Sequence, residues 1–391
     1  MAADRYDVLI VGGGIMGSAT AYNLVNLEPQ LKVAVVERDF SYERASTTLS
    51  AANLRTVGFS LKENYLISKQ SFRILETFED RMAVDGDRPH LYLRREGNLL
   101  LANDAGLAEA QAIFDMHRRL GSDALWLQPE EIKERWPLFD VSGIAGGAYG
   151  PNDGHLDAHA MLTAYKRKAA SLGATFIQAE VVDLLKGPGR VDGARLSSGE
   201  AMAAEKTVNC AGGWAADVAG MAGIAIPVSP VQRQVFVVDT KIKPERPLPF
   251  VFHPSGLWFR SETGGLLILG RSMEEDRTGY DFKWDRDRFM NILWPALAEF
   301  VPAFDTLKLI RGWTGLYEVN TLDSNAVIGP WPDLEGFYLC NGFSGHGMMQ
   351  GPAVGQYLAE IITGRPTTMD LSVFSPERIV DHCPIGESGC Y

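Results

Sequence analysis

The sequence predicts an α/β fold in two parts, one built on a parallel sheet and the other on a mixed, largely antiparallel sheet. A strand, a Gly-rich turn, a helix and a second strand follow one another in the first 37 residues. A similar strand, Gly-rich turn and helix occur between residues 337 and 363. Short apolar runs separated by turn residues lie between them, which is typical of antiparallel strands. At about 150 residues per domain, the 391 residues predict two or three domains.

The N-terminal unit has the order of a βαβ motif. Residues 6–11 form a short run rich in β-branched side chains, which predicts a buried parallel strand. Residues 12–17 are rich in glycine, residues 18–26 have a helical pattern, and residues 32–36 form a second buried run. This order and spacing predict one Rossmann-like βαβ unit.

Three glycines in the turn have the spacing of a dinucleotide-binding fingerprint. Gly12 permits the tight turn, Gly14 lets a pyrophosphate approach the backbone, and Gly17 lets the helix pack on the strand. The N-terminus of the helix supplies free N–H groups for the phosphates. Glu37 ends the second strand about 20 residues after Gly17, where a carboxylate accepts hydrogen bonds from ribose hydroxyls. These residues predict a dinucleotide site for a cofactor without a 2′-phosphate.

The second Gly-rich segment covers residues 341–348, after a strand at 337–340 and before a helix at 351–363. It can offer backbone N–H groups to a distant part of a long cofactor. NAD has no need for a contact so far along the chain, whereas the isoalloxazine of FAD reaches into another layer of the fold. The two Gly-rich segments together therefore favour FAD over NAD.

The remaining segments divide between the two expected domains. Helices are expected at residues 105–120, 129–136, 159–172 and 286–300, strands at 91–101, 175–185, 191–196, 207–210, 235–239, 257–260 and 266–270, and a loop at 143–154. The expected FAD-binding domain is discontinuous and takes residues 1–85, 146–226 and 321–391. The expected substrate-binding domain takes residues 86–145 and 227–320.

The composition is that of an ordinary globular protein, with 46% apolar and 22% charged residues. The formal net charge of −12 gives no support to nucleic-acid binding. No apolar run reaches the roughly 20 residues of a membrane span, and the N-terminus lacks the basic region of a signal peptide. We therefore expect a cytoplasmic protein without an integral membrane segment, in an oligomeric state that stays open. The four cysteines lack metal-ligand spacing, and no metal site is expected.

Five motifs spread along the chain are shared with one family of flavoenzymes. They are the turn at 12–17 with Glu37, the segment from Ser46 to Arg55, residues 208–214, residues 227–230 and residues 342–347. With these motifs the chain resembles the D-amino-acid oxidase superfamily of FAD enzymes, in particular its sarcosine oxidase and glycine oxidase branches. The resemblance implies that a hydride leaves a carbon beside an amine, that water hydrolyses the imine, and that O2 usually reoxidises FAD with release of peroxide. The flavin supplies this chemistry and the protein positions the substrate.

The resemblance also implies which residues contact FAD. Besides the three glycines and Glu37 they are Ile15, Met16, Arg38, Ser46, Thr47, Val182, Ala211, Gly212, Trp214, Gly342, Ser344, Gly345, His346, Gly347 and Met348. Leu316 stands where monomeric sarcosine oxidases attach FAD through a cysteine. We therefore expect FAD to be bound non-covalently.

At three positions near the expected flavin, the sequence can be compared with the residues that are usual in the family. The substrate-binding arginine is retained as Arg55, whereas its usual lysine partner is replaced by Met349. Ile268 stands in place of the flavin-facing lysine that is thought to assist O2. The missing lysine predicts a slow reaction with O2. A dehydrogenase that passes electrons to a quinone or carrier is therefore the enzymatic alternative.

A predicted hairpin offers a second positive charge. Trp258 and Arg260 point the same way because side chains alternate along a strand. A turn centred on residue 263 pairs Trp258 with Ile268 and directs Arg260 into the cavity; the alternative is that Arg260 is a plain surface charge. Two guanidinium forks, Arg55 and Arg260, favour a dianionic amine. Iminodiacetate is the specific candidate, and sarcosine or glycine come second.

Three more residues complete the expected site. Tyr317 is expected to hydrogen-bond a carboxylate, His346 to maintain the backbone geometry beside the flavin, and Trp258 to line the cavity or pack in the core. Glu318 is expected to be solvated or paired. The sequence thus predicts a FAD-dependent amine oxidoreductase that acts on a small anionic amine, with O2 or another electron acceptor.

Residues 45–61 and 294–344 also resemble mitochondrial FAD-dependent oxidoreductase domain-containing proteins linked to respiratory-complex assembly. This resemblance leaves a non-enzymatic alternative open, an assembly factor that holds FAD. Steady turnover with release of peroxide separates the oxidase from both alternatives.

Overall fold

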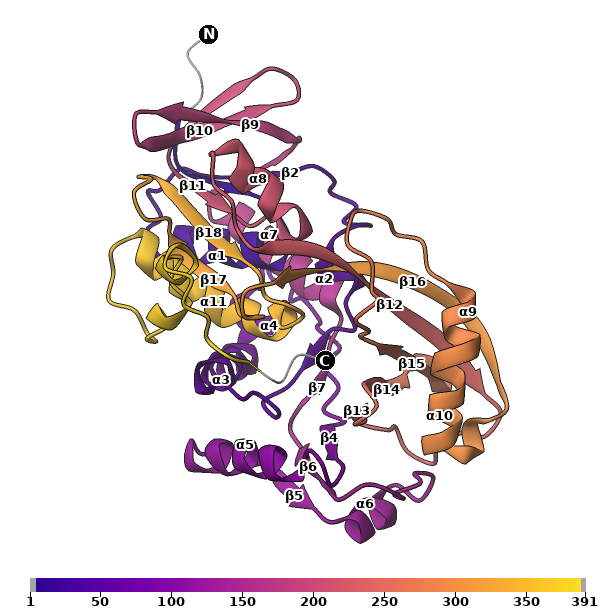
Figure 1. Cartoon of the computed structure of the whole chain (residues 1–391). Helices are drawn as coiled ribbons and strands as arrows, with labels where there is room; N and C mark the ends of the chain where they lie inside the picture. The colour runs from indigo at the N-terminus through magenta and orange to yellow at the C-terminus, as the bar shows by residue number, and fades with distance from the viewer. Residues whose placement is uncertain (1–4, 388–391) are drawn as a thin grey trace.

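Two sheets with helices packed on them make up the body of the protein in the computed structural model, which describes residues 5–387 (Figure 1). The strands of the first sheet are β1 (Arg5–Val11), β2 (Val33–Glu37), β8 (Thr175–Gln178), β9 (Val181–Gly187), β10 (Arg190–Leu196), β11 (Ala201–Asn209), β17 (Val327–Pro330) and β18 (Phe337–Asn341). Their order is β17-β18-β11-β1-β2-β8, and β9 and β10 extend the sheet from β11. Segments from the beginning, middle and end of the chain therefore share one sheet.

The centre of the first sheet is parallel, and its strands end at one level. Ile10 of β1 lies opposite Val208 of β11 and Val35 of β2. The N–H of Gly12 donates to the carbonyl of Val36 at 2.8 Å, which joins the Gly-rich turn to the end of β2. Ligands of such sheets bind at the carboxyl ends of the strands. The first sheet therefore fixes where a cofactor site can lie.

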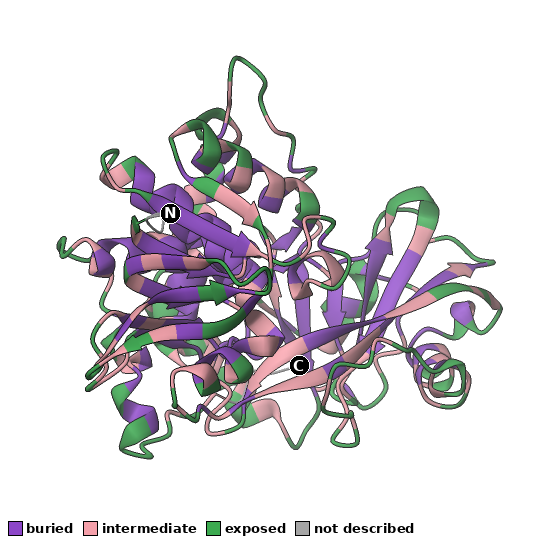
Figure 2. Cartoon of the chain, turned by 90° about the horizontal axis from the view of Figure 1, so that it is seen from above, coloured by how far each residue is buried: buried purple, intermediate pink, exposed green. Residues whose placement is uncertain are grey.

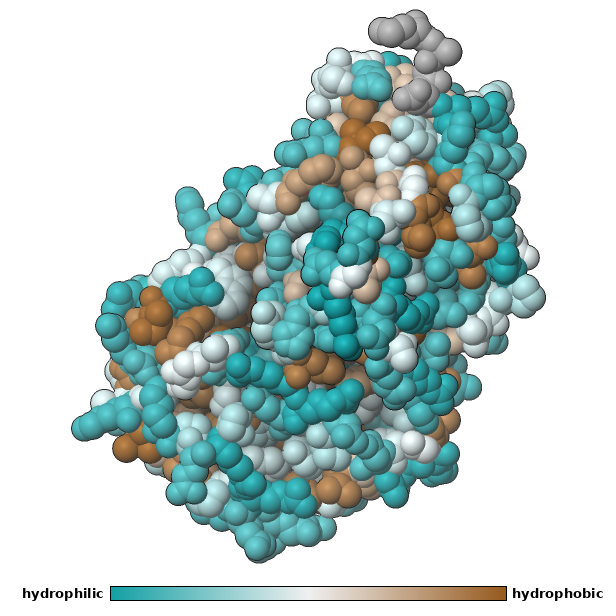
Figure 3. Space-filling model, turned by 180° about the vertical axis from the view of Figure 1, so that it is seen from behind, coloured by the Kyte–Doolittle hydropathy of each residue, from teal (hydrophilic) through white to brown (hydrophobic). Residues whose placement is uncertain are grey.

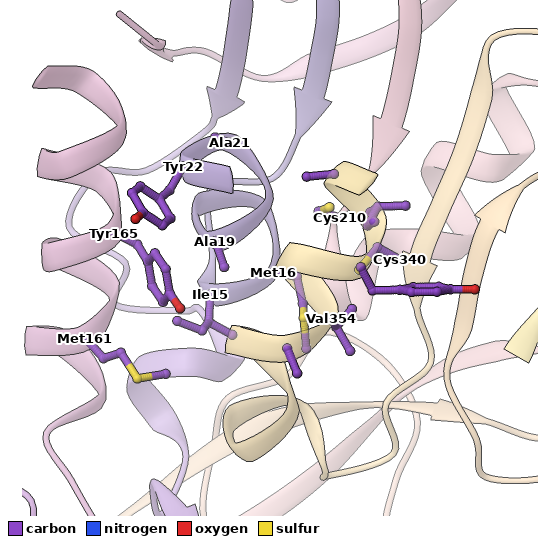
Figure 4. Close-up of a cluster of buried hydrophobic side chains, with 14 of the residues drawn as sticks. Ile15, Met16, Ala19, Ala21, Tyr22, Met161, Tyr165, Cys210, Cys340 and Val354 are labelled. Carbon is purple, nitrogen blue, oxygen red and sulfur yellow. The ribbon is translucent and has the colours of Figure 1, made fainter. Parts of the chain in front are cut away.

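Four long helices cover this sheet and one another. They are α1 (Ile15–Leu27), α3 (Lys62–Glu76), α7 (Ala158–Ser171) and α11 (Gly347–Ile362). Helix α1 packs against both α7 and α11, as the close-up of the buried cluster shows (Figure 4). Tyr22 of α1 meets Tyr165 of α7 with ring centroids 5.7 Å apart. Gly355 of α11 lies so close to α1 that a Cβ added to Gly355 would be 2.6 Å from the methyl group of Ala19.

The second sheet is mixed and largely antiparallel, as the sequence predicts. Its strands are β4 (Asn98–Ala102), β5 (Leu125–Leu127), β6 (Gly146–Gly150), β12 (Val228–Thr240), β13 (Phe250–Phe252), β14 (Leu257–Glu262), β15 (Leu266–Arg271) and β16 (Leu307–Asn320). Their order is β16-β12-β15-β14-β13-β4-β6-β5, and β13 pairs with β4 in parallel. Helices α5 (Leu107–Arg119), α6 (Pro129–Arg135), α9 (Arg286–Arg288) and α10 (Trp294–Phe300) belong to this half of the molecule (Figure 1). A short ribbon, β3 (Asn53–Leu54) with β7 (Gly154–His155), completes the pairing.

Buried side chains are concentrated in the strands and on the inner helix faces, and the loops are mostly exposed (Figure 2). The view from behind shows a mainly hydrophilic surface with separate apolar patches (Figure 3). None of the helices within residues 5–387 is both long and apolar enough to cross a membrane. Cys390, the one cysteine outside this range, lies beyond the described residues.

The loop expected at residues 143–154 contains a strand instead. Residues 146–150 form β6, which pairs with β4 and β5 in the second sheet. Glycine allows this close pairing, because a Cβ at Gly147 would be 2.9 Å from the carbonyl of Leu100. The apolar alternation that marks a strand in sequence is absent here. A domain boundary at residue 146 would therefore cut a strand from its sheet.

The hairpin of β14 and β15 has a different register from the one expected. Arg260 pairs with Ile268, and Trp258 pairs with Gly270. Residues 263–265 form the turn, and Gly264 has φ of 74°. The hairpin is therefore centred on residue 264 and not on residue 263. Each residue of β14 thus pairs with a residue of β15 two positions further along than expected. Trp258, Arg260 and Ile268 still share one face, because a shift of two preserves the alternation.

A buried ion pair holds the C-terminal part of the chain on the core. Arg378 of α12 (Glu377–Val380) contacts Asp323 at 2.9 Å, with side-chain exposures of 7% and 0%. We expect Asp323→Ala to lower the free energy of unfolding by about 3–5 kcal/mol, because it leaves a buried guanidinium unpaired. Asp87→Ala is the control, since its pair with Arg167 is exposed and should contribute less than about 1 kcal/mol. Urea denaturation measures both; equal losses would contradict the prediction.

Candidate functional site

One large cavity lies where the first sheet ends and the second sheet begins. It encloses about 1910 Å³, its open mouth included. The cavity runs from the first Gly-rich turn to the second, so both segments face the same space. Its wall takes residues from the Gly-rich turn, from residues 44–55, from the end of β11, from β16 and from residues 343–349.

The Gly-rich turn forms the floor of the cavity by backbone contact. Gly12 has φ of 100°, and a Cβ there would overlap the carbonyl of Cys210. A Cβ at Gly17 would overlap the carbonyl of Gly12, so helix and strand touch through their backbones. At Gly14 a Cβ would be 3.3 Å from Thr47 Oγ1, so no backbone blocks that position. The same hydroxyl accepts the N–H of Ile15 at 3.1 Å.

Glu37 stands at the end of β2 on the cavity wall. Its carboxylate accepts the N–H of Gly13 at 2.8 Å through Oε2 and the N–H of Asp39 at 3.0 Å through Oε1. Next to it, the guanidinium of Arg38 lies over the ring of Trp214, with Cζ 3.5 Å from the ring centroid. These residues come from β2 and from the turn after β11, and the cavity brings them together.

Most residues that were expected to contact the cofactor line this cavity. Those on the wall are Gly12, Gly14, Ile15, Met16, Glu37, Arg38, Ser46, Thr47, Ala211, Gly212, Trp214, Ser344, Gly345, His346, Gly347 and Met348. Gly17 and Gly342 lie behind the wall, where they shape the two turns. Val182 is an exception: its side chain is 46% exposed, and the neighbouring Val181 lines the cavity. Alternation along β9 turns the two side chains to opposite faces.

The second Gly-rich segment turns sharply between β18 and α11. Gly342, Ser344 and Gly345 all have positive φ, of 75°, 51° and 99°. Ser344 is held in this conformation by its hydroxyl, which accepts the N–H of Asn320 at 3.0 Å and donates to the carbonyl of Gly342. A Cβ at Gly345 would overlap the ring of Tyr317, so this turn packs directly on β16.

Glu318 is part of the cavity wall, a place that was not expected for it. Its Oε2 accepts the N–H of Gly342 at 3.1 Å, and its carbonyl accepts the N–H of Ser344 at 3.2 Å. Burial raises the pKa of this carboxyl to about 7, against the hydrogen bonds from Gly342 and Phe343. The signal in the sequence was an acid next to Tyr317. Glu318 was expected to be either solvated or paired, and the structure shows it hydrogen-bonded to the turn.

Arg55 and His346 meet on the other side of the cavity. Arg55 is 2% exposed, and its Nη2 lies 3.1 Å from Nε2 of His346. Its Nη1 donates to the carbonyl of Val57 at 2.6 Å. The guanidinium also lies over the ring of Phe59, with Cζ 4.1 Å from the centroid, and the same ring meets His346 edge-on at 5.2 Å. Phe59 therefore supports both polar groups.

Asp153 lies immediately behind Arg55. Its Oδ1 accepts both the N–H and the hydroxyl of Thr56 at 2.9 Å. Burial raises the pKa of Asp153 to about 7, although Thr56 and the charge of Arg55 act to lower it. The side chain thus anchors the backbone that carries Arg55.

The second expected guanidinium does not reach the cavity wall. Arg260 is 4% exposed, and its Nη1 donates to Glu262 at 2.9 Å and to the carbonyl of Ser261 at 2.8 Å. Its Nη2 donates to the carbonyl of Ala51 at 3.3 Å. A buried guanidinium needs a counter-charge, and Glu262 supplies it from the same face of the same strand. Arg260 is thus neither a free surface charge nor a second fork in the cavity.

The remaining expected residues divide between wall and core. Tyr317, Trp258, Met349 and Leu316 line the cavity. Ile268 is 3% exposed and packs with Trp258 in an apolar cluster behind the wall. Ile268 was expected to pair with Trp258, but the shifted hairpin register places it beside Arg260. Among residues 5–387 no group of three acidic, histidine or cysteine side chains could hold a metal ion.

The sequence of residues 7–361 matches the family model described as DAO, FAD dependent oxidoreductase. The chain belongs to this family. FAD dependent oxidoreductase domain-containing protein 1 of Bos taurus is 34% identical over 97% of this chain and 87% of its own length. Glycine oxidase of Geobacillus kaustophilus is 26% identical over 96% of this chain and 97% of its own length. The resemblance seen in the sequence and the expectation of FAD are confirmed, and the protein is a FAD-dependent oxidoreductase.

Solved structures with the same fold support this assignment. L-proline dehydrogenase from P. horikoshii superposes with a TM-score of 0.87 at 26% identity, over 97% of this chain and 99% of that one. Iminodiacetate oxidase from Chelativorans sp. BNC1 superposes with a TM-score of 0.80 at 22% identity, over 94% of this chain and 98% of that one. The second similarity is one of fold alone. Together they confirm the predicted α/β class.

Two glycine substitutions distinguish cofactor contact from folding. Gly14→Ala adds a Cβ that meets only a hydroxyl, so the protein should fold. It should lose most of its flavin, because the expected fingerprint would place the added methyl group against the pyrophosphate. Gly17→Ala overlaps the backbone of the Gly-rich turn, so it should lower the yield of folded protein. Flavin released after acid precipitation, per folded protein, measures the first effect and circular dichroism the second. A fully flavinated Gly14→Ala protein would contradict the placement of the cofactor.

Glu318 should make the stability of the protein depend on pH. Its pKa of about 7 lies above the ordinary value of 4.5, so folding favours the protonated form. This contribution to stability is complete below about pH 4.5 and is lost as the pH rises through 7. We expect Glu318→Gln to reduce the fall in melting temperature between about pH 5 and pH 8, with the remaining fall due in part to Asp153. If the melting temperature of Glu318→Gln falls with pH as steeply as that of the parent protein, folding does not raise the pKa of Glu318.

Proposed function

We propose that the protein uses FAD to oxidise the C–N bond of a small amine or amino acid that carries a carboxylate. The observation that carries this proposal is Arg55, a buried guanidinium on the cavity wall next to His346. A guanidinium fork binds a carboxylate through two parallel hydrogen bonds, which fixes the orientation of the substrate. FAD, when bound, accepts the hydride, and the resulting imine is hydrolysed by water.

In this proposal the cavity residues divide by task. Gly12, Gly14 and the first N–H groups of α1 hold the pyrophosphate, and Glu37 holds the ribose. The turn at 342–348 holds the flavin. Leu316 replaces the cysteine of covalent flavoproteins, which supports non-covalent binding. The first sheet with its helices is the cofactor domain, and the second sheet is the substrate domain.

A single carboxylate suits the cavity better than two. Of the two arginines expected to bind carboxylates, Arg55 lines the cavity and Arg260 is engaged by Glu262. A monocarboxylate such as sarcosine, glycine or a similar secondary amine therefore fits better than iminodiacetate. Tyr317 lines the same cavity and can donate its hydroxyl to the substrate. The substrate amine must be neutral when the hydride leaves, and the positive charge of Arg55 favours its deprotonation.

The electron acceptor is O2 or a carrier, and one observation favours the carrier. Ile268 stands where the oxidases have a lysine, and it is buried behind the wall. A dehydrogenase of the same chemistry is therefore the second candidate. The similarity to L-proline dehydrogenase from P. horikoshii supports it.

A panel of amines tests the proposed function directly. The purified protein is mixed with sarcosine, glycine, proline, iminodiacetate and an amine without a carboxylate, first without O2 and then in air. Loss of the flavin absorbance without O2 identifies substrates, and peroxide release in air identifies an oxidase. Bleaching without peroxide indicates the dehydrogenase. Bleaching by none of the amines, or by the uncharged amine alone, would refute the proposal.

Arg55→Lys tests the role of the guanidinium. Lysine keeps the charge but loses the fork, and a hydrogen bond to a charged group contributes roughly 1.5–3 kcal/mol. We expect kcat/KM for carboxylate substrates to fall about 10- to 150-fold, mainly through KM. Arg260→Lys is the control, since it changes a buried ion pair behind the wall and should affect all amines alike. An equal loss for charged and uncharged amines in Arg55→Lys would contradict the assignment.

A further inference from the structure

The C-terminal segment lies outside the matched family region and yet returns to the candidate site. The family model ends at residue 361, and the described chain continues to 387. The N–H of Ile385 donates to Asp323 at 3.1 Å, and its carbonyl accepts the side-chain amide of Asn325 at 2.8 Å. Arg378 binds the same Asp323. Residues 378–385 are thus fixed to the turn between β16 and β17.

Glu387 continues this attachment on the other side of the segment. Its Oε1 accepts the N–H of Ser60 at 2.8 Å and the hydroxyl of Ser60 at 2.7 Å. Its Oε2 accepts the N–H of Leu61 at 3.2 Å and the side-chain amide of Asn64 at 2.8 Å. Leu61 is the N-cap residue of α3. A carboxylate placed here satisfies N–H groups at the helix start and interacts favourably with the helix dipole.

The residue before Ser60 connects this contact to the candidate substrate site. Phe59 is fully buried, and its ring supports both Arg55 and His346. Its carbonyl is hydrogen-bonded to Nε2 of His117 at 2.8 Å. Burial lowers the pKa of His117 to about 4, so its imidazole is neutral near pH 7 and donates to this carbonyl. Glu387 and His117 therefore hold the backbone on either side of the Phe59 peptide unit.

A second route leads from Glu387 to His346. Asn64, which donates to Glu387, accepts the side-chain amide of Gln350 at 2.9 Å through its own oxygen. The N–H of Gln350 donates to the carbonyl of His346 at 3.2 Å. Burial acts to raise the pKa of Glu387, but hydrogen bonds from Ser60 and Asn64 and the nearby His346 outweigh it, and the pKa is lowered. The carboxylate is therefore charged near neutral pH.

We propose that Glu387 is a positioning residue for the substrate site. By tying residues 383–387 to the start of α3, it fixes Phe59 and so aligns Arg55 and His346 with the substrate carboxylate. This inference rests on the proposed function, because it assigns the same Arg55–His346 pair to carboxylate binding. It adds a segment beyond the matched family region to the determinants of substrate affinity.

Kinetics of Glu387→Ala and Glu387→Gln test the proposal in the full-length protein. A 1 Å displacement of a binding group can cost roughly 100-fold. Because Glu387 acts through Phe59, we expect a smaller effect in Glu387→Ala, a rise of about tenfold in KM for a carboxylate amine with kcat changed less than about twofold. Glu387→Gln keeps one acceptor oxygen and should recover part of the loss. An amine without a carboxylate should keep its KM in both variants.

Glu377→Ala is the matched control. Glu377 lies in the same C-terminal segment, on α12, but belongs to the exposed face of the chain. Its removal should leave KM and kcat unchanged. Hydrogen exchange gives an independent readout, because the amides of Ser60 and Leu61 should exchange faster in Glu387→Ala than in Glu377→Ala. Faster exchange with an unchanged KM would overturn the proposal, as would an equal loss for amines with and without a carboxylate.

Acetate separates this inference from the proposed function. It is a simple carboxylate probe whose binding is followed by the change in flavin absorbance. Weaker acetate binding in Glu387→Ala than in Glu377→Ala supports the positioning role, even if none of the amines in the panel is oxidised. Equal acetate affinities in the two variants overturn it. Absence of any acetate binding to the parent protein also overturns it, because the aligned pair would then receive no carboxylate.

Discussion

The contact between the backbones of α1, β1 and β11 is the constraint on which the rest of the site depends. At Gly12 and Gly17 the helix and strands approach so closely that neither position has room for a Cβ. This contact directs the first N–H groups of α1 at the ends of the parallel strands. The cavity lies at this edge of the first sheet. The other residues that line the cavity lie around this edge.

The pair β12 and β16 brings the second half of the molecule to this edge. The two strands pair from Val228 opposite Asn320 to Thr240 opposite Leu307. One end of the pair lies against the turn after β18, where Glu318 and Tyr317 contact the backbone of residues 342–345. The other end, at Thr240 and Leu307, lies at the edge of the second sheet. The pair thus connects the turn after β18 with the second sheet.

The sequence predicted the elements in which local pattern and function coincide. The glycines at 12–17, Glu37 and the turn at 342–347 could be recognised because a dinucleotide imposes their spacing. The wall residue Glu318 and helix α3 carry no such signature, and only the folded chain shows what they contact. Strand β6 was missed because its glycines replace apolar alternation with close backbone pairing. Prediction failed where tertiary contacts, and not local spacing, decide the structure.

The hairpin shows how a correct principle gave an incomplete answer. Alternation along β14 placed Trp258 and Arg260 on one face, and the structure has them so. The register depends on the length of the turn, however, and a side chain that points toward a cavity still needs an open path to it. The guanidinium of Arg260 is instead held by Glu262, which lies two residues along the strand on the same face and forms an ion pair with it.

The two buried arginines therefore differ in what surrounds them and not in how deeply they lie. Arg260 is neutralised within its own strand by Glu262. Arg55 lies on the cavity wall, donates to the carbonyl of Val57 and lies over the face of Phe59. A guanidinium on a cavity wall can offer a planar fork that matches a carboxylate, and this is the physical reason to look for the substrate among carboxylates.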